Sequence, residues 1–313
     1  MVATCDGINL FQKLNSKVIL YYIIFPIFYL LSLLPLRVLY LLSDFAYFLI
    51  YYCFGYRKDV VIKNLNIAFP NKTEAEKIRI AKDFYHLFAD TFIETIKLIS
   101  ISKKEFLRRC EFDPTLIQQL SSKQQSIQLH SGHFFNYEFM NLAISMYCKN
   151  NFLGVYAPIS NKAFDKIIKD MRSKFGTILI PNSEFKTNFA AYSTQPYTIG
   201  LIADQNPSNP TKAIWTNFLG KKTAFVRGPE VGSKGNNTAV LMVYIYPKKR
   251  GYYKIETSLL TTEPKETASG FITKSLIQFI EQKINEHPSN YLWSHKRWKH
   301  EFDEEKYSKL FIH

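Results

Sequence analysis

The chain has 313 residues, 47% of them hydrophobic and 16% aromatic, with a formal net charge of +14. This length allows one large α/β domain or two small ones, and the charge favours a polyanionic partner such as nucleic acid, anionic lipid or an acidic carrier protein. No nucleic-acid fold signature accompanies the charge, so we expect no nucleic-acid partner. The four cysteines lack metal-type spacing and are typical of reduced cytosolic thiols or small apolar core residues.

The first predicted element is a membrane helix. Residues 18–36 run for nineteen positions without a charge, which is about the length that crosses a hydrocarbon core. The run is long for a cleaved signal peptide and no small-residue cleavage site follows it. A membrane span is therefore favoured over a signal peptide and over a buried core helix.

A second apolar stretch, residues 38–54, follows directly and contains Asp44. A carboxylate at the centre of a bilayer costs roughly 3 kcal/mol, so we expect an interfacial or domain-packed helix here. Residues 1–56 are thus predicted to form a membrane anchor. The cations that flank it favour a cytosolic location for the large C-terminal part.

Residues 57–313 are predicted to form one α/β domain. Thr73 and Glu76 form a capping-box pattern at the start of a helix over residues 73–99. Alternating strands and helices imply a largely parallel or mixed sheet flanked by helices. The expected strands are residues 126–130, 152–156, 177–180, 197–202, 238–246 and 252–257. The later helices are expected at residues 134–147, 161–175, 184–193, 229–235 and 267–286.

The candidate chemistry lies in QLHSGHFFNYEFMNLAISMY, residues 128–147. An apolar strand ends there, a small-residue turn follows, and a helix begins near Phe134. Ligands of α/β sheets gather at the carboxyl ends of strands. His133 at the mouth of the helix and Glu138 in its first turns are close enough for the carboxylate to orient the imidazole, which would then accept a proton from an attacking hydroxyl. Spacing alone leaves His130 as an alternative base, and a structural histidine as the plainer interpretation.

This segment resembles the H-x4-D/E motif of the glycerolipid and lipid A acyltransferases, and four further segments resemble blocks of the lipid A late acyltransferases. They are RKDVVIKNLNIAFP within residues 57–85, YAPISNKAFDKIIKDMRSKFG at 156–176, LIADQNP with WTNFLGKKTAFVRGPE within 201–230, and YLWSHKRWK at 291–299. The resemblance covers most of the chain, in order and with sensible gaps. It implies a glycerolipid-acyltransferase-like mixed sheet, a catalytic domain after the anchor, and no metal or other cofactor.

By this resemblance, His133 is the general base and Glu138 its partner. Arg172 would bind a phosphate or the developing charge, a role that suits its planar and permanently ionised donor fork. From the residue alone, a solvated helix cation is the favoured interpretation of Arg172. Phe135 stands where the family commonly has glycine, which adds bulk beside the base.

The resemblance assigns two more groups of residues to substrate binding. Asp204 and Gln205 would line the site and position the acceptor or His133, although Asp-Gln-Asn-Pro is also ordinary turn chemistry. His295 and Arg297 belong to a basic cluster that would bind an acidic head group or the carrier. An exposed run of charge is the alternative for that cluster.

The expected activity is transfer of a fatty acyl chain from an acyl thioester, on acyl carrier protein or coenzyme A, to a hydroxyl of a phosphorylated glycolipid, a lipid A precursor. The Pro-Glu-Gly-Thr block of the glycerolipid branch is absent from the sequence, which argues against a lysophosphatidate acyltransferase. Two alternatives remain open. One changes the acceptor to another glycolipid, a phospholipid or an aminoacyl lipid, and the other is a non-enzymatic basic protein that binds a membrane surface.

Overall fold

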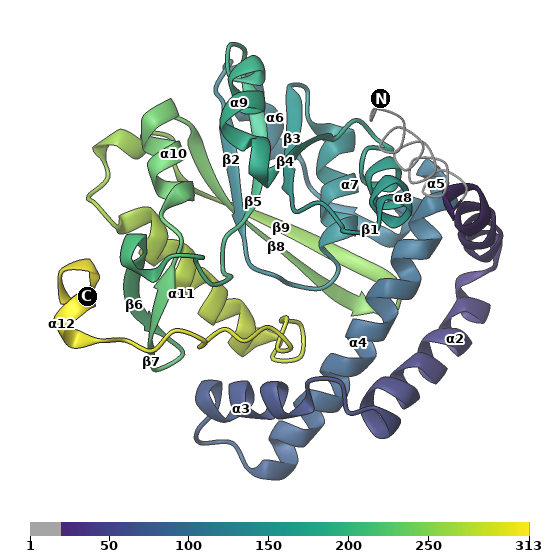
Figure 1. Cartoon of the computed structure of the whole chain (residues 1–313). Helices are drawn as coiled ribbons and strands as arrows, with labels where there is room; N and C mark the ends of the chain where they lie inside the picture. Colours follow the sequence, from purple (N-terminus) through teal and green to yellow (C-terminus); the bar gives the residue numbers. More distant parts are fainter. Residues whose placement is uncertain (1–19, 313) are drawn as a thin grey trace, which may run out of the picture.

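The computed structural model describes residues 20–312 and shows a twisted sheet covered by helices (Figure 1). The sheet has seven strands in the order β1-β9-β8-β2-β5-β3-β4, and β6 and β7 form a separate hairpin. Its neighbouring strands are parallel except β8 and β9, which are antiparallel. The strands are β1 (Cys110–Phe112), β2 (Ile127–Ser131), β3 (Asn151–Tyr156), β4 (Ile178–Pro181), β5 (Tyr197–Ile202), β6 (Ile214–Phe218), β7 (Lys221–Phe225), β8 (Ala239–Lys249) and β9 (Tyr252–Thr261).

Helices cover the sheet because parallel strands need long connections that pass over its faces. Helices α10 and α11 pack against β2, and α7 packs against β1 and β3. As a result every residue of β2 is buried. The helices are α2 (Leu36–Phe48), α3 (Lys58–Ala68), α4 (Glu74–Ser100), α5 (Lys103–Arg109), α6 (Thr115–Ser122), α7 (Tyr137–Tyr147), α8 (Lys162–Arg172), α9 (Phe185–Tyr192), α10 (Gly228–Asn236), α11 (Phe271–Glu286) and α12 (Glu304–Tyr307).

The mixed α/β fold expected from the sequence is confirmed, and the six expected strands appear as β2, β3, β4, β5, β8 and β9. The capping box of α4 is also confirmed: the backbone N–H of Thr73 donates to the Glu76 carboxylate at 2.7 Å, and the backbone N–H of Glu76 donates to the Thr73 hydroxyl at 3.3 Å. Strands β1, β6 and β7 were not expected. Each is short, and β1 has only three residues, too few for an alternating pattern to identify.

The N-terminal helices differ from the expected single span. The first described helix, Leu20–Leu33, ends before Pro35, because a residue that precedes proline is pushed out of the helical region. A new helix then begins at Leu36, and Leu36–Cys53 is the segment whose length and composition suffice to cross a membrane. The expected span over residues 18–36 is therefore broken, and its first two residues lie outside the described part of the chain. Helix α2 packs against α4, as expected for a domain-packed helix over residues 38–54, and its Asp44 is paired with Arg250 at 2.6 Å.

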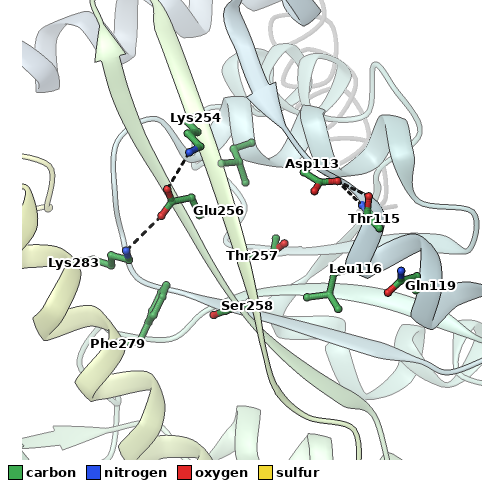
Figure 2. Close-up of a pocket in the computed structure, with 11 residues that line it drawn as sticks. Asp113, Thr115, Leu116, Gln119, Lys254, Glu256, Thr257, Ser258, Phe279 and Lys283 are labelled. Atoms are coloured by element: carbon green, nitrogen blue, oxygen red, sulfur yellow. Dashed lines mark hydrogen bonds and ion pairs between the residues drawn. The ribbon is translucent and has the colours of Figure 1, made fainter.

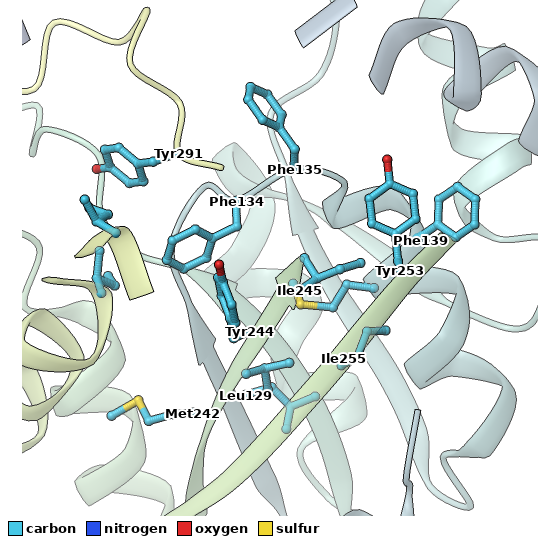
Figure 3. Close-up of a cluster of buried hydrophobic side chains, with 14 of the residues drawn as sticks. Leu129, Phe134, Phe135, Phe139, Met242, Tyr244, Ile245, Tyr253, Ile255 and Tyr291 are labelled. Carbon is cyan, nitrogen blue, oxygen red and sulfur yellow. The ribbon is translucent and has the colours of Figure 1, made fainter. Parts of the chain in front are cut away.

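Aromatic side chains fill the core between the start of α7 and the β8–β9 hairpin (Figure 3). Phe134 packs edge-on against Tyr244, with ring centroids 4.7 Å apart, and Phe139 lies 4.9 Å from Tyr253. Such contacts add to the stabilisation that comes from burying the rings. The loop that carries the candidate histidine is therefore fixed by large side chains on both sides of it.

Candidate active site

His133 and Asp204 are brought together by the sheet. His133 follows β2 and Asp204 follows β5, and these two strands are parallel neighbours in which Ser131 lies opposite Ile202. Because the carboxyl ends of parallel strands meet at one edge of the sheet, the two residues lie side by side although 71 positions separate them. The Asp204 carboxylate accepts from the backbone N–H of His133 at 3.0 Å and contacts the ring Nδ1 at 2.5 Å.

The Asp204 carboxylate is 1% exposed and charged. Burial raises its pKa, but the attraction and hydrogen bonds of His133 outweigh burial and, with the charge of Arg297, hold the pKa at about 2. A carboxylate at Nδ1 favours the tautomer with the proton on that nitrogen. The lone pair of Nε2 then faces the site, where it accepts a hydrogen bond from the Gln205 side-chain amide at 3.0 Å. The imidazole is 19% exposed, so a substrate can reach it.

Glu138 does not hold the imidazole as the sequence suggested. Its carboxylate is bound by the guanidinium of Arg172, through Nη2 at 2.6 Å and through Nε at 2.9 and 3.0 Å. Glu138 lies in the first turn of α7 and Arg172 is the last residue of α8. The side chain of Glu138 is directed towards that helix end, and Asp204 occupies the position beside Nδ1 of His133.

Arg172 is therefore not a solvated helix cation. Burial lowers its pKa, but the charge of Glu138 and the hydrogen bonds that Arg172 donates to Glu138 raise it above the ordinary value. A bidentate pair of this kind fixes the orientation of the guanidinium plane. An anionic substrate group that binds Arg172 has to share it with Glu138.

A cavity of about 480 Å³ joins the two pairs. His133, Glu138, Arg172 and Gln205 line one part of it, together with Tyr137. The remainder is largely apolar, which is typical of a site for a hydrophobic ligand with a few polar groups that fix its orientation. The apolar part is lined by Leu129, Met140, Ile144, Phe152, Leu179 and Val243, and by the glycines of β3 and β5, Gly154 and Gly200.

A larger cavity, of about 560 Å³, lies elsewhere, between α6, β9 and α11 (Figure 2). None of the residues proposed from the sequence lines it. Its charged side chains largely pair with one another, since Glu256 lies 3.4 Å from both Lys254 and Lys283. The smaller cavity, which contains the histidine and the Arg172–Glu138 pair, is the better candidate for chemistry.

Arg297 does not face a head group as the sequence suggested. It is 2% exposed and donates to the Asn206 side chain at 3.0 Å and to the carbonyl of Ala224 at 2.9 Å. Its guanidinium carbon lies 4.1 Å from the centre of the Phe225 ring, and burial lowers its pKa. The guanidinium supports the turn after Asp204 from inside the protein. The YLWSHKRWK segment is consequently not a run of exposed charge.

His295 also supports that turn. Its Nε2 accepts a weak hydrogen bond from the backbone N–H of Asn206 at 3.4 Å. Burial lowers the pKa of His295 to about 4, so the ring is neutral at pH 7 and free to accept. Sequence reasoning missed Asn206, which reads as a turn residue. It also missed Tyr291, a buried tyrosine whose pKa is raised by burial and by the charge of Asp204.

A buried carboxylate beside an accessible histidine, at the mouth of an apolar cavity and at the carboxyl ends of parallel strands, is an arrangement typical of α/β enzymes that act on hydrophobic substrates. The family model described as bacterial lipid A biosynthesis acyltransferase matches residues 10–300. The chain belongs to this acyltransferase family, which confirms the resemblance found in the sequence. No curated protein matches the chain closely enough to count as a relative.

Proposed function

We propose that the protein transfers a fatty acyl chain from an acyl thioester, on acyl carrier protein or coenzyme A, to a hydroxyl of a lipid A precursor, with His133 as the general base. The observation that carries the proposal is the Asp204–His133 pair at the mouth of the apolar cavity, with Nδ1 of the ring 2.5 Å from the carboxylate. Family membership supports the choice of acceptor.

In the proposed reaction, Nε2 of His133 takes the proton of the acceptor hydroxyl while its oxygen attacks the thioester carbonyl. The resulting imidazolium is stabilised by Asp204. When the carbon–sulfur bond breaks, the thiolate leaves and takes the proton back from Nε2, so the base is regenerated. A positioned base of this kind contributes about 10²–10⁴-fold. The Gln205 amide now lies where the acceptor hydroxyl would bind, so it has to move when the acceptor enters.

Arg172 and Glu138 have a second role in the proposal. The guanidinium lines the same cavity as His133, and a fixed cation there is suited to an anionic substrate group or to charge that develops on the carbonyl oxygen. Glu138 orients the guanidinium and is not a partner of the base. The positive net charge suits both an acidic carrier and a phosphorylated acceptor.

The N-terminal helices support attachment to a membrane, which we propose is the inner membrane with the catalytic domain on its cytoplasmic side. Large apolar side chains along these helices are exposed, which a soluble surface disfavours. Their gathering on neighbouring helices suits insertion into lipid. They include Tyr22, Ile23, Ile27, Leu30, Leu33, Leu41, Phe45, Phe48, Tyr52 and Phe54.

Lipid mass spectrometry tests the proposal directly. Deleting the gene should remove one acyl chain from lipid A, and the wild-type gene should restore it whereas His133→Ala should not. Purified protein offered acyl carrier protein thioesters or coenzyme A thioesters would then identify the donor. Unchanged lipid A in the deletion strain, or full restoration by His133→Ala, would refute the proposed reaction.

A further inference from the structure

A buried carboxylate outside the pocket connects three parts of the molecule. Glu94, in α4, is 1% exposed. Its Oε1 accepts from the hydroxyl of Tyr40 at 2.7 Å, and its Oε2 accepts from the hydroxyl of Tyr253 at 2.5 Å and from the side-chain amide of Asn136 at 3.0 Å. Tyr40 belongs to α2, Tyr253 to β9, and Asn136 is the N-cap of α7.

Tyr40 belongs to a row of polar side chains on the side of α2 that faces the rest of the protein. Tyr40, Ser43 and Asp44 have the spacing that places side chains on one helix face. Ser43 donates to Asp90 of α4 at 2.6 Å, and Arg250 bridges Asp90 and Asp44, with a 2.6 Å contact to each. The opposite side of α2 exposes large apolar residues. These polar contacts therefore fix the position of α2 on the α/β domain.

The connection through Asn136 leads into the active site. Asn136 lies between His133 and Glu138, and its backbone carbonyl accepts the first hydrogen bond of α7, from Phe139 at 3.0 Å. Its side chain makes no capping bond, and within the described residues its amide oxygen has no hydrogen-bond partner. The bond to Glu94 is thus the polar contact that sets the orientation of this side chain.

The burial of Glu94 is costly, which argues for a role other than stability. Burial raises its pKa to about 7, although hydrogen bonds from Tyr253, Tyr40 and Asn136 lower it. Replacing buried charged groups with well-packed apolar ones is often neutral or stabilising. Both oxygens of the Glu94 carboxylate are hydrogen-bonded, and a buried carboxylate held in this way specifies one arrangement of the elements that it joins.

We propose that Glu94 is a positioning residue for acyl transfer: by holding Tyr40 and Asn136 at once, it makes the geometry of the loop between His133 and Glu138 depend on how α2 sits on the body. This inference rests on the proposed function. It means that the apolar helix does more than anchor the enzyme, because displacing α2 would disturb the site through one carboxylate.

A swap of hydrogen-bond polarity tests the Glu94–Asn136 contact. Asn136→Asp places two carboxylates face to face, and we expect kcat to fall roughly 10- to 100-fold, because misplacing catalytic groups by about 1 Å has that effect. KM for the acyl thioester should stay within about twofold of wild type. Adding Glu94→Gln restores an N–H···O bond with the donor on the other residue, and the double variant should recover most of the lost kcat.

Two further variants test the link to α2. Tyr40→Phe removes one hydroxyl and should lower kcat several-fold with KM little changed. Tyr252→Phe, next to Tyr253 on β9 and outside the Glu94 network, is the matched control and should behave as wild type. Thermal unfolding and membrane association of each variant are measured alongside activity.

The outcomes are distinguishable from failure of the proposed function. If the wild-type enzyme is active, a double variant no better than folded Asn136→Asp overturns the inference, as does a kcat of Tyr40→Phe equal to that of Tyr252→Phe. If Asn136→Asp does not fold, the comparison of the two tyrosine variants decides. A wild-type enzyme without acyl-transfer activity refutes the proposed function itself.

Discussion

Replacing Asp204 with asparagine removes one charge from the proposed base and leaves its shape nearly unchanged. The carboxylate accepts two hydrogen bonds from His133, one from the backbone N–H and one from Nδ1. An asparagine has one acceptor oxygen for these two donors. Either the buried backbone N–H loses its partner, or the amide N–H₂ faces Nδ1 and forces the ring proton onto Nε2, the wrong tautomer for a base.

The effect on activity should be large. In serine proteases the equivalent change of the aspartate lowers kcat by about 10⁴-fold through the wrong tautomer, and we expect a loss of roughly 10³- to 10⁴-fold here. The assay is release of free thiol from the acyl thioester in the presence of the lipid acceptor. Asp170→Asn is the matched control, because Asp170 forms an exposed ion pair with Lys166 in α8. Its activity should stay within about twofold of wild type.

Stability should change in a defined direction with pH. The pKa of Asp204 falls from 3.8 to about 2 in the folded protein, and at about 1.4 kcal/mol per unit the charged carboxylate contributes roughly 2 kcal/mol to the free energy of unfolding. Because the folded pKa is depressed, this contribution is present above about pH 4 and is lost as the pH falls towards the folded value. For activity, an Asp204→Asn variant that keeps more than a tenth of the wild-type kcat would refute the assignment of Asp204 as the group that orients His133.

Three further predictions concern the pocket and the anchor. Arg172→Lys keeps the charge but loses the bidentate geometry to Glu138, so the rate of thiol release should fall at least tenfold. The control Lys249→Arg, at an exposed position, should leave this rate unchanged. Equal rates in the two variants would mean that Arg172 has no specific role in the reaction. Gly200→Ala adds a methyl group to the pocket wall 3.5 Å from Phe152, which is a tolerable contact. When acyl thioesters of different length compete, the preferred acyl chain should become shorter. An unchanged preference would mean that the acyl chain binds elsewhere. The double change Leu41→Lys and Phe45→Lys on the exposed side of α2 should weaken binding to lipid vesicles in a flotation assay. The midpoint of thermal unfolding should not fall. Flotation equal to that of the wild type would contradict insertion of this side of α2 into lipid.

Some features of the site are local and were predictable from the sequence. The expected strand, residues 126–130, is followed by a small-residue turn, so the sequence alone places His133 just after the carboxyl end of a strand. The capping box of Thr73 and Glu76 is formed within one turn of chain, and its outcome matches the pattern. The ordered motifs also indicated the acyltransferase family, because each motif is a short segment that can be recognised from the order of its residues along the chain.

The partner of His133 is a different case. Glu138 is five positions away and Asp204 is 71, but β2 and β5 are neighbours in the sheet. The order of the strands in the sheet depends on how helices and strands pack, and a local sequence pattern does not predict this packing. The resemblance had assigned Asp204 to the site, to position the acceptor or His133, but only the tertiary structure shows that Asp204 binds the imidazole and that Glu138 binds Arg172.

Burial was likewise decided by packing. The cluster around Arg297 has the composition of a solvated surface, yet the Phe225 ring and the turn after Asp204 enclose its guanidinium. At the N-terminus, composition identified an apolar region but not its division at Pro35. Asp44 indicated that the second stretch packs on the domain, but only the structure shows Arg250 as its partner. The sequence determined which segments are apolar, which are strands and where the candidate base lies. Which charges meet, and which are buried, depended on contacts between residues far apart in the chain.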